Sequence, residues 1–570
     1  MKVTDYIAKY LLLNGVKTVF GYQGSSIAHL IDSISLCDGM DFVEMRHEQG
    51  AAFAANGAAL ANNKLGVAIS CSGPGALNLV TGIADAWYDS LPCVFITGQV
   101  SQKEMKTDPT IRQCGFQETD VVSVVSSITK YAVSIKKPED IPEELKKAIT
   151  IAISGRKGPV LLDIPHNIQG SQIVADMLDA AKSEETKGIV ATNIEKLITT
   201  VKRPVILIGG GSITINTSTQ QVLEQASIPV VTSYRGKTKI DNTIDTYCGT
   251  IGAYGERYAN WALKYSDLII CIGSRLDGRQ TLGEPLQLSK QQNIIVCDID
   301  EAELRKYPAE YHKICADAKD FMDAIILILQ NKNFTEWLST IKQWKKRHPV
   351  GNEYDLQDKV NPNFFLAMLS GLLNETANIT VDVGQNQLWS NTSLVIKEKQ
   401  NLIQSCGLGA MGFALPAAIG AYKACPAQTI CITGDGGMQM NSQELQTVVQ
   451  NNIPLKVIVL NNSCLGLIRD YQSKALGGRY YGSIVGFGSP QYQLLAQAYG
   501  LRYMCVEDDN TLANFENVLG DDQPYIIEVK ISQQSTGCPE PTYGKSIVDQ
   551  SKIISEDEKK RVEEEAYVCR

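Results

Sequence analysis

Short apolar runs alternate along the chain with longer segments whose apolar residues recur at helical spacing. In the first block these runs are KTVFGY, DFVEM, LGVAISC, CVFITG and PVLLDIP. Runs of this length are typical of strands buried on both faces of a sheet, and helices between them indicate parallel neighbours. The pattern therefore predicts a parallel sheet with crossover helices in residues 1–170.

The same alternation returns in two further blocks. Residues 190–340 contain RPVILIGGG, IPVVTS, DLIICIG and NIIVCDID, and residues 360–535 contain NITVDVG, QTICITG, LKVIVLNN and YIIEVK. The polar stretches AAKSEETKG and KKRHPVGNEYDLQDKVNPN separate the blocks, and the charged tail, residues 536–570, is expected to fray or to cover a neighbour. We predict an α/β protein with three doubly wound parallel-sheet domains, the first and third similar in pattern.

Composition and charge narrow the class of protein. The 570 residues are 44% apolar and 20% charged, as in a soluble protein with three or four domains of ~100–200 residues. The net charge is −9, and the scattered lysines and arginines form no basic stripe for a nucleic acid. The 15 cysteines show no CxxC pair, which favours reduced thiols in the cytoplasm and disfavours zinc. The start, MKVTDYIAKYLLLNG, has the pattern of an amphipathic helix, and no run reaches the ~18 apolar residues of a membrane span.

The stretch CITGDGGMQM joins two predicted strands through a predicted helix. QTICITG ends at Gly434, NSQELQTVVQNN has a helical pattern, and LKVIVL is followed by Asn461 and Asn462. Asn441 is expected to cap this helix, with Glu444 as its capping-box partner. In a right-handed crossover, Asp435 and Asn462 then lie at the carboxyl edge of one sheet, where α/β folds bind ligands.

These residue types suit a diphosphate and a metal. An Asp carboxylate, an Asn carbonyl and ligand phosphates are oxygen donors of the kind that Mg²⁺ prefers. Gly436 and Gly437 let the backbone approach a phosphate, and a helix N-terminus favours its charge. GDG alone is a turn, but GDG with strand, helix, strand and NN resembles the signature of enzymes that use thiamine diphosphate (ThDP).

ThDP chemistry also needs a carboxylate against the aminopyrimidine ring, where it favours the imino tautomer that removes the thiazolium proton. In RHEQG, Glu48 follows a predicted strand and opens an Ala-rich helix. Alone, this stretch is a polar turn that caps a packed helix. Beside a diphosphate motif, Glu48 becomes the favoured catalytic acid/base, and its neighbour His47 is interpreted as structural.

Nearly the whole chain resembles the catalytic subunit of acetolactate (acetohydroxyacid) synthase and related carboligases, including those of branched-chain sugar biosynthesis. The matching pieces are FGYQGS, RHEQGAA, SGPGALNLVTGIADAWYDSLPCVFITGQV, GFQETD, GPVLLDIP, DVGQNQLW, GLGAMGFALPAAIGA, GDGG and LNNSCLG. The resemblance implies pyrimidine-binding, middle and diphosphate-binding domains. It also implies a homodimer or tetramer in which Glu48 of one subunit faces Asp435 and Asn462 of the other.

The resemblance assigns further roles residue by residue. Asp435, Asn462 and the Cys464 carbonyl would hold Mg²⁺. Met411 would support the bent cofactor between its rings, although core packing would equally explain this residue. Gly24, Phe116 and Gln117 would line the reacting centre. The remaining positions expected at the cofactor are Gly384, Gln385, Asn386, Gly409, Gly434, Gly436 and Gly437.

The middle domain of this family holds FAD. VILIGGGS, GTIGAYGERYAN, GSRLDGR and VCDID match it, which places FAD near Gly211, Arg275 and Asp298. A bare glycine run is a weak signal, so a middle domain without flavin is the alternative. Acetyl transfer has no net redox step, and a flavin here would therefore be structural.

Several positions on the acceptor side depart from the family. His166 stands where the family has Lys, Gly278 replaces an Asp beside the retained Arg279, and Tyr471 replaces a Trp. The segment 101–114 is also longer than usual. Arg279 could hold an acceptor carboxylate in a bidentate pair, or a phosphate. These changes concern the second substrate more than the first.

The residues leave several activities to weigh. None of the 5 histidines is adjacent to another, which disfavours a pyruvate decarboxylase, and the presence of Glu48 disfavours a glyoxylate carboligase. We predict a ThDP- and Mg²⁺-dependent carboligase that decarboxylates pyruvate and transfers its two-carbon unit to a keto acceptor. Acetolactate is the product if pyruvate is the acceptor, and a branched-chain sugar is the product if a ketosugar nucleotide is. A pyruvate oxidase is a less favoured hypothesis, and the intact Glu48, Asp435 and Asn462 disfavour a non-catalytic partner of the same fold.

Overall fold

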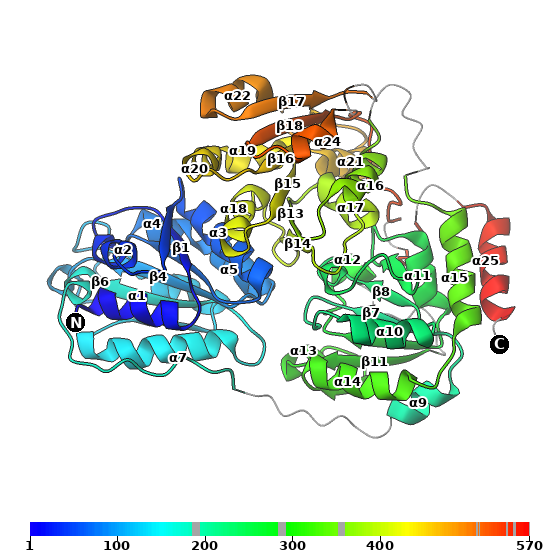
Figure 1. The fold of residues 1–570 in the computed structure, drawn as a ribbon, viewed down its shortest axis with the longest axis horizontal. Coiled ribbons are helices and arrows are strands. Elements are labelled where there is room, and N and C mark those ends of the chain that lie inside the picture. Colours follow the sequence, from blue (N-terminus) through cyan, green and yellow to red (C-terminus); the bar gives the residue numbers. More distant parts are fainter. Residues whose placement is uncertain are drawn as a thin grey trace.

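A computed structural model describes residues 1–184, 194–282, 292–351, 360–508, 511, 514–542, 545–550 and 554–568. It contains three six-stranded sheets, each with only parallel neighbours and each surrounded by helices (Figure 1). The predicted α/β architecture of three parallel sheets is confirmed. Parts of both predicted linkers, and the expected boundary at residue 190, lie outside the described residues.

The first sheet has the order β2-β1-β3-β4-β6-β5. Its strands are β1 (Thr18–Gly21), β2 (Asp41–Glu44), β3 (Gly66–Ser70), β4 (Cys93–Gln99), β5 (Tyr131–Ser134) and β6 (Val160–Pro165). Its helices are α1 (Val3–Leu13), α2 (Ala28–Ser35), α3 (Glu48–Asn62), α4 (Pro74–Asn78), α5 (Val80–Tyr88), α6 (Val121–Val125), α7 (Ile141–Ile153) and α8 (His166–Gln169), with 3₁₀ turns η1 (Gln102–Glu104), η2 (Ser126–Ile128) and η3 (Pro138–Asp140).

The middle sheet has the order β12-β11-β10-β7-β8-β9. Its strands are β7 (Pro204–Ile208), β8 (Val230–Thr232), β9 (Tyr247–Thr250), β10 (Leu268–Ile272), β11 (Asn293–Asp298) and β12 (His312–Cys315). Its helices are α9 (Ile194–Thr200), α10 (Thr217–Gln225), α11 (Arg257–Tyr265), α12 (Gly278–Thr281), α13 (Glu301–Arg305), α14 (Ala318–Leu329) and α15 (Thr335–Arg347), with the 3₁₀ turn η4 (Lys237–Lys239).

The third sheet has the order β14-β13-β15-β16-β18-β17. Its strands are β13 (Ala377–Val381), β14 (Asn401–Gln404), β15 (Gln428–Gly434), β16 (Lys456–Asn461), β17 (Arg502–Val506) and β18 (Tyr525–Lys530). Its helices are α16 (Pro362–Leu372), α17 (Gln385–Ser393), α18 (Ala414–Ala424), α19 (Asp435–Met440), α20 (Leu445–Gln450), α21 (Gly466–Ala475), α22 (Tyr492–Tyr499) and α24 (Phe515–Leu519), with the 3₁₀ turn η5 (Ser442–Glu444).

Helices α3 and α18 join the first and third sheets (Figure 1). Both helices are rich in Ala and Gly, so their backbones approach closely. A Cβ atom on Gly57 would overlap the carbonyl of Ala417, and one on Gly420 would overlap the carbonyl of Ala54. One hydrophobic core therefore extends from β1 and β3 across this contact to β15 and β16.

The C-terminal tail covers the middle domain. Helix α25 (Glu556–Val568) packs on α15, far from the first domain in Figure 1. Arg347 pairs with Glu558 at 3.0 Å and with Glu565 at 2.7 Å, and the Trp344 indole donates to Glu565 at 2.9 Å. The tail was expected either to fray or to cover a neighbour, and its described part covers the middle domain.

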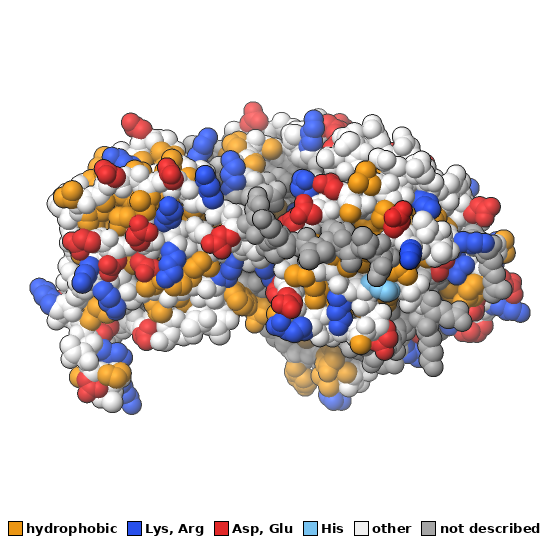
Figure 2. All heavy atoms as spheres, turned by 90° about the horizontal axis from the view of Figure 1, so that it is seen from below, with side chains coloured by type: hydrophobic (Ala, Val, Ile, Leu, Met, Phe, Trp, Pro, Cys, Tyr) orange, Lys and Arg blue, Asp and Glu red, His pale blue; other side chains and the backbone are white. Residues whose placement is uncertain are grey.

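The outer surface is mixed in character. On the face in Figure 2, lysine and arginine side chains are interspersed with aspartate, glutamate and small hydrophobic groups. Within the described part of the chain, every helix is too short or too polar to cross a bilayer.

Candidate active site

Glu48 lies at the first turn of α3, just beyond the carboxyl end of β2. His47 is the N-cap of this helix, and its Nδ1 accepts a hydrogen bond from the Gln49 amide at 3.2 Å. The Glu48 side chain is only 7% exposed, and its Oε2 accepts a hydrogen bond from Asn78 Nδ2 at 3.0 Å. His47 thus has the structural role expected of it, and Asn78 on α4 is a contact of Glu48 that the sequence did not reveal.

The turn at residues 71–75, which leads from the end of β3 into the first residues of α4, brings the expected reacting-centre residues Gly24 and Gln117 close to Glu48. A Cβ atom on Gly75 would lie 2.9 Å from Glu48 Oε1, and one on Gly24 would lie 2.7 Å from Cys71 Cβ. Gln117 has a φ of +66° and lies against Gly73 of the same turn. The loops that carry Gly24, Glu48 and Gln117 therefore meet at this turn.

Phe116 differs from these neighbours because its side chain is 87% exposed. The loop that carries it is held by Glu118, two residues further on, whose carboxylate accepts hydrogen bonds from the amides of Lys106 at 2.7 Å and Cys114 at 2.8 Å. The Phe116 ring therefore points away from the rest of its own chain.

Asp435 and Asn462 lie at the carboxyl ends of β15 and β16, which are parallel neighbours. Asp435 is 2% exposed, and its carboxylate accepts hydrogen bonds from the Gly436 amide at 3.0 Å and from Ser489 Oγ at 3.3 Å. Burial raises the pKa of Asp435 to about 6, although these donors oppose the shift. Asn462 Oδ1 lies 3.3 Å from the Cys464 amide, so the predicted metal residues form one cluster.

The segment that begins α17 completes this cluster. Gln385 Oε1 accepts a hydrogen bond from Asn462 Nδ2 at 2.9 Å, and Asn386 donates to the Asp382 carbonyl at 2.6 Å. Gly384 has a φ of +145°, and a Cβ atom there would lie 2.5 Å from Asn386 Oδ1. Glycine at position 384 therefore allows both this backbone conformation and the close approach of the Asn386 side chain.

The GLGAMGF loop lies against the same strand ends. Met411 Cε is 3.2 Å from where a Cβ atom on Gly436 would lie, and a Cβ atom on Gly437 would lie 2.9 Å from the Asp382 carboxylate. Gly409 has a φ of +72°, and Gly434 faces Asn386. The predicted diphosphate-side residues other than Gly409 thus lie at the carboxyl ends of β13, β15 and β16, and the Gly409 amide donates to Ser405 Oγ at 3.0 Å.

Asp382 is a second residue that the sequence analysis missed. Its carboxylate is 1% exposed and accepts hydrogen bonds from the amides of Gly412 at 2.9 Å and Ala414 at 3.1 Å. Burial raises its pKa to about 6. Asp382 therefore shapes the loop that carries Met411, and its place at the end of NITVDVG was the available signal.

The predicted capping box at Asn441 and Glu444 is wrong. Asn441 donates to the Gly412 carbonyl at 2.9 Å and makes no side-chain cap for the turn η5. The Glu444 carboxylate instead accepts hydrogen bonds from the amides of Arg46 and His47 in the first domain. Tertiary contact decides where both side chains point, because each finds a partner outside its own helix.

A cavity of about 500 Å³ lies where residues of all three domains meet. Gly211, Arg275 and Asp298, the residues predicted to hold a flavin, all line it, and Arg279 does too. Gly211 packs against Gly273, and a Cβ atom on Gly211 would lie 3.1 Å from the Gly273 carbonyl. The glycine run is therefore needed for close packing of two strand-end turns, besides leaving the backbone accessible.

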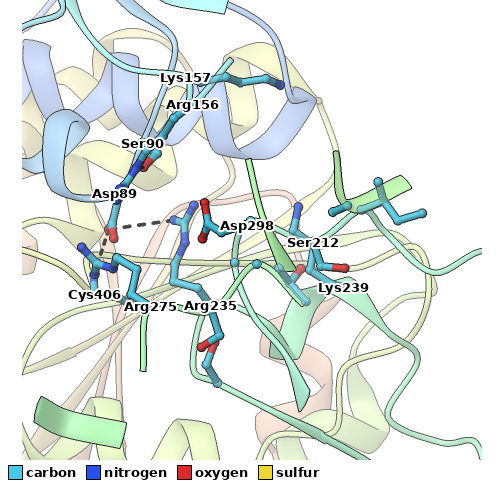
Figure 3. Close-up of a pocket in the computed structure, with 18 of the residues that line it drawn as sticks. Asp89, Ser90, Arg156, Lys157, Ser212, Arg235, Lys239, Arg275, Asp298 and Cys406 are labelled. Carbon is cyan, nitrogen blue, oxygen red and sulfur yellow. Dashed lines mark hydrogen bonds and ion pairs between the residues drawn. The ribbon is translucent and has the colours of Figure 1, made fainter. Parts of the chain in front are cut away.

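Cationic side chains dominate one side of this cavity (Figure 3). Arg235 lies 4.0 Å from the Asp89 carboxylate, and Arg275 donates to the Tyr88 carbonyl at 2.9 Å, so both approach the end of α5. Burial raises the pKa of Asp298, and it lowers the pKa of Lys239 to about 8. The cavity thus offers guanidinium groups for an anion and a partly buried carboxyl for hydroxyl groups.

The three acceptor-side residues are not brought together in one chain. Arg279 donates to Gln387 Oε1 at 3.1 Å and lies over the Tyr234 ring. His166 packs against the His29 ring in the first domain, and Tyr471 lies half-exposed on α21 in the third domain. No described contact joins any two of them.

The matches to protein families agree with this arrangement. Residues 1–124 match the thiamine pyrophosphate enzyme N-terminal TPP binding domain, residues 191–325 match the central domain, and residues 382–529 match the C-terminal TPP binding domain. The fold and site therefore define the class: the chain is a member of the thiamine pyrophosphate enzymes.

Relatives identify the branch of this class. The probable acetolactate synthase large subunit of Methanocaldococcus jannaschii is 36% identical over 555 residues, covering 93% of this chain and 92% of that protein. The acetolactate synthase large subunit of Lactococcus lactis is 34% identical, covering 92% of each chain. The acetolactate synthase isozyme 2 large subunit of Escherichia coli is 33% identical, covering 95% of this chain and 97% of that protein. The chain belongs to the acetolactate synthase large-subunit family, and the resemblance found in the sequence is confirmed.

Proposed function

We propose that the protein is a ThDP-dependent carboligase that decarboxylates pyruvate and transfers the two-carbon unit to a second keto acid. The observation that carries this proposal is the alignment of more than nine-tenths of the chain with an acetolactate synthase large subunit. The position of Asp435 and Asn462 at adjoining strand ends supports it. The relatives do not favour a ketosugar nucleotide as the acceptor.

The residues of the diphosphate side would bind and orient the cofactor. Asp435, Asn462 and the Cys464 carbonyl form an oxygen donor set that fits Mg²⁺, which binds few protein groups and keeps phosphate oxygens. Gly384, Asn386 and the other residues around these strand ends would receive the diphosphate. When bound, ThDP supplies the electron sink for decarboxylation and carbon–carbon bond formation.

Glu48 would hold and move a proton at the pyrimidine ring. Its Oε2 is oriented by Asn78, and its Oε1 faces Gly75, so the carboxylate is held without a nearby cation among the described contacts. A general acid/base must exchange its proton, and pairing with a fixed cation would oppose that exchange. Gly24 and Gln117, beside the same turn, would shape the space for pyruvate.

We also propose that the site is shared between two copies of the chain. The exposed Phe116 beside the Glu48 turn supports this proposal, since a partner subunit would cover that ring.

The proposed domains are residues 1–170, 190–340 and 360–535, with residues 536–570 as a tail, and each described sheet falls within one of them.

The proposed flavin fits the cavity between the domains. Guanidinium groups of Arg235 and Arg275 suit the pyrophosphate of FAD, and Asp298 at the end of β11 suits a ribose hydroxyl. Purified protein should therefore carry a flavin absorbance that Asp298→Ala reduces and that excess ADP displaces. A colourless protein that binds neither FAD nor ADP would remove this part of the proposal.

The decisive experiment identifies the product. Protein is incubated with pyruvate, ThDP and Mg²⁺, alone or with 2-oxobutyrate or a ketosugar nucleotide, and the carbon–carbon bonded product is identified by mass. Acetolactate from pyruvate alone is expected. A product that forms only with the sugar would overturn the keto-acid acceptor, and stoichiometric bleaching of FAD by anaerobic pyruvate would indicate an oxidase.

A further inference from the structure

The Glu444 carboxylate of the third domain ends at the first-domain turn that carries Glu48. Both of its oxygens lie 3.1 Å from the Arg46 amide, and Oε1 also lies 3.1 Å from the His47 amide. Arg46 and His47 are the two residues immediately before Glu48. The carboxylate thus binds the backbone of that turn, although Arg46 and Glu444 are 398 positions apart in the chain.

The surroundings of Glu444 leave it little freedom to point elsewhere. The side chain is fully buried, and its Oε2 also accepts a hydrogen bond from Thr447 Oγ1 at 2.8 Å. A Cβ atom on Gly50 would overlap Glu444 Oε1, so the first turn of α3 is shaped around the carboxylate. The Arg46 guanidinium bonds Gln450 of α20, which adds a second link from the third domain to the same turn.

We propose that Glu444 is a positioning residue that fixes the Glu48 turn, an inference that rests on the proposed role of Glu48. Amide donors that face a buried carboxylate lose their bonds if the turn shifts, and an unsatisfied buried group is costly. Glu444 therefore holds the backbone from which Glu48 extends. Small displacements of a catalytic group reduce rates by about a hundredfold, so this restraint affects turnover without touching the cofactor.

Glu444 also connects the two halves of the cofactor machinery within one chain. It ends η5, the element that follows α19, and the first residue of α19 is Asp435. In the proposed dimer, Asp435 anchors one cofactor while Glu48 of the same chain serves the other. Glu444 therefore links the segment that carries one diphosphate site to the turn that carries the acid/base group of the other site.

Three variants test the proposal. Glu444→Ala removes both acceptor oxygens, Glu444→Gln keeps a carbonyl oxygen that can accept from the amides, and Gln443→Ala is the matched control. The Gln443 amide bonds Asn441 within its own domain at 2.9 Å. We expect Glu444→Ala to lower kcat about tenfold to a hundredfold with little change in the ThDP affinity, and Glu444→Gln to restore most of it.

Hydrogen exchange in the cofactor-free protein tests the contact between Glu444 and the Glu48 turn directly. Hydrogen exchange of the Arg46 and His47 amides should accelerate in Glu444→Ala, and both Glu444→Gln and Gln443→Ala should remain protected. Unchanged exchange and unchanged kcat in Glu444→Ala would overturn the proposal. If the proposed function is wrong instead, the wild type forms no acetolactate, but the exchange result still reports whether Glu444 holds the turn.

Mixed dimers test whether Glu444→Ala lowers activity through Glu48 of the same chain. A chain with Asp435→Ala supplies Glu48, and a chain with Glu48→Gln supplies Asp435, so their dimer has one intact site. Adding Glu444→Ala to the chain that supplies Glu48 should lower the activity of this dimer, and adding it to the other chain should not. Equal loss from both placements would show that Glu444 does not act through its own Glu48.

Discussion

Buried carboxylates in this protein take different roles because different groups surround them. The Asp382 carboxylate accepts hydrogen bonds from backbone amides and shapes a loop. The Asp435 carboxylate accepts a hydrogen bond from the Gly436 amide at the end of a strand. Glu48 is bound through one oxygen by the Asn78 amide and faces glycine with the other. Among these three groups, Glu48 therefore accepts the fewest hydrogen bonds, which supports its proposed role as the acid/base residue.

Replacement of Glu48 by Gln tests this role at the scale of one residue. The amide cannot take a proton, so kcat for acetolactate formation should fall at least about a hundredfold. ThDP should still bind, because Glu48 does not lie among the diphosphate-side residues, and calorimetry measures that binding. Glu44→Gln, at the end of β2, is the control and should stay active. Full activity of Glu48→Gln would contradict the mechanism.

Asp163 provides a pH-dependent prediction away from the site. The side chain is 3% exposed and accepts hydrogen bonds from Thr97 at 2.8 Å and Gln99 at 3.2 Å. Burial raises its pKa from 3.8 to about 6, so the folded state holds the proton more tightly than the unfolded state. The stability that this group contributes is therefore fully present below its pKa in the unfolded state. It is lost as the pH rises through its pKa in the folded state, and the total loss is about 3 kcal/mol.

The melting temperature tests this linkage. Between about pH 4 and about pH 6, the wild type should lose stability relative to Asp163→Asn, and above that range their difference should be constant. Parallel pH profiles of the two proteins would show that Asp163 does not titrate in this window.

At the scale of elements, the pattern of apolar runs found the central strands and missed five at sheet edges. The missed strands are β5, β9, β12, β14 and β17, and each one ends its sheet. An edge strand has a neighbour on one side only, and its sequence need not be continuously apolar. YAVS, HKIC and NLIQ accordingly lack the long Val and Ile runs of the strands that were predicted.

The contact between α3 and α18 depends on glycine at the element scale. Gly420→Ala should place a methyl group against the Ala54 carbonyl and lower stability by about 1–3 kcal/mol. Gly371→Ala is the matched control, because it lies in helix α16 with nothing within 4 Å of its Cβ position. It should be neutral or stabilising, since Ala is the better helix former. Equal melting temperatures for the two variants would contradict this packing.

At the scale of the whole molecule, the three sheets create sites that none of them contains alone. The cavity with Arg275 and Asp298 needs residues from all three domains. The Glu48 turn rests on Glu444 of another domain, and Phe116 remains exposed beside it. The proposed activity therefore depends on contacts between domains and, in the proposed dimer, on contacts between chains.

Subunit complementation tests the shared site. Glu48→Gln and Asp435→Ala homodimers should each be inactive, and a random mixture formed by co-refolding or co-expression should regain about a quarter of wild-type activity, since half the dimers hold one intact site of two. If each chain contained its own complete site, the mixture would stay inactive. A different affinity tag on each chain, followed by purification over both tags in turn, confirms that mixed oligomers form.

The sequence by itself determined the parallel sheets and the two strand ends that carry Asp435 and Asn462, and it singled out Glu48 as the proposed acid/base residue. Periodicity and chain order are local properties, and parallel strands place their carboxyl ends at one edge whatever surrounds them. The tertiary structure alone decided that Glu444 binds the Glu48 turn, that Asn78 orients Glu48, and that three domains enclose one cavity. These contacts join residues distant along the chain, and their energy comes from burial and hydrogen bonding that no local pattern records.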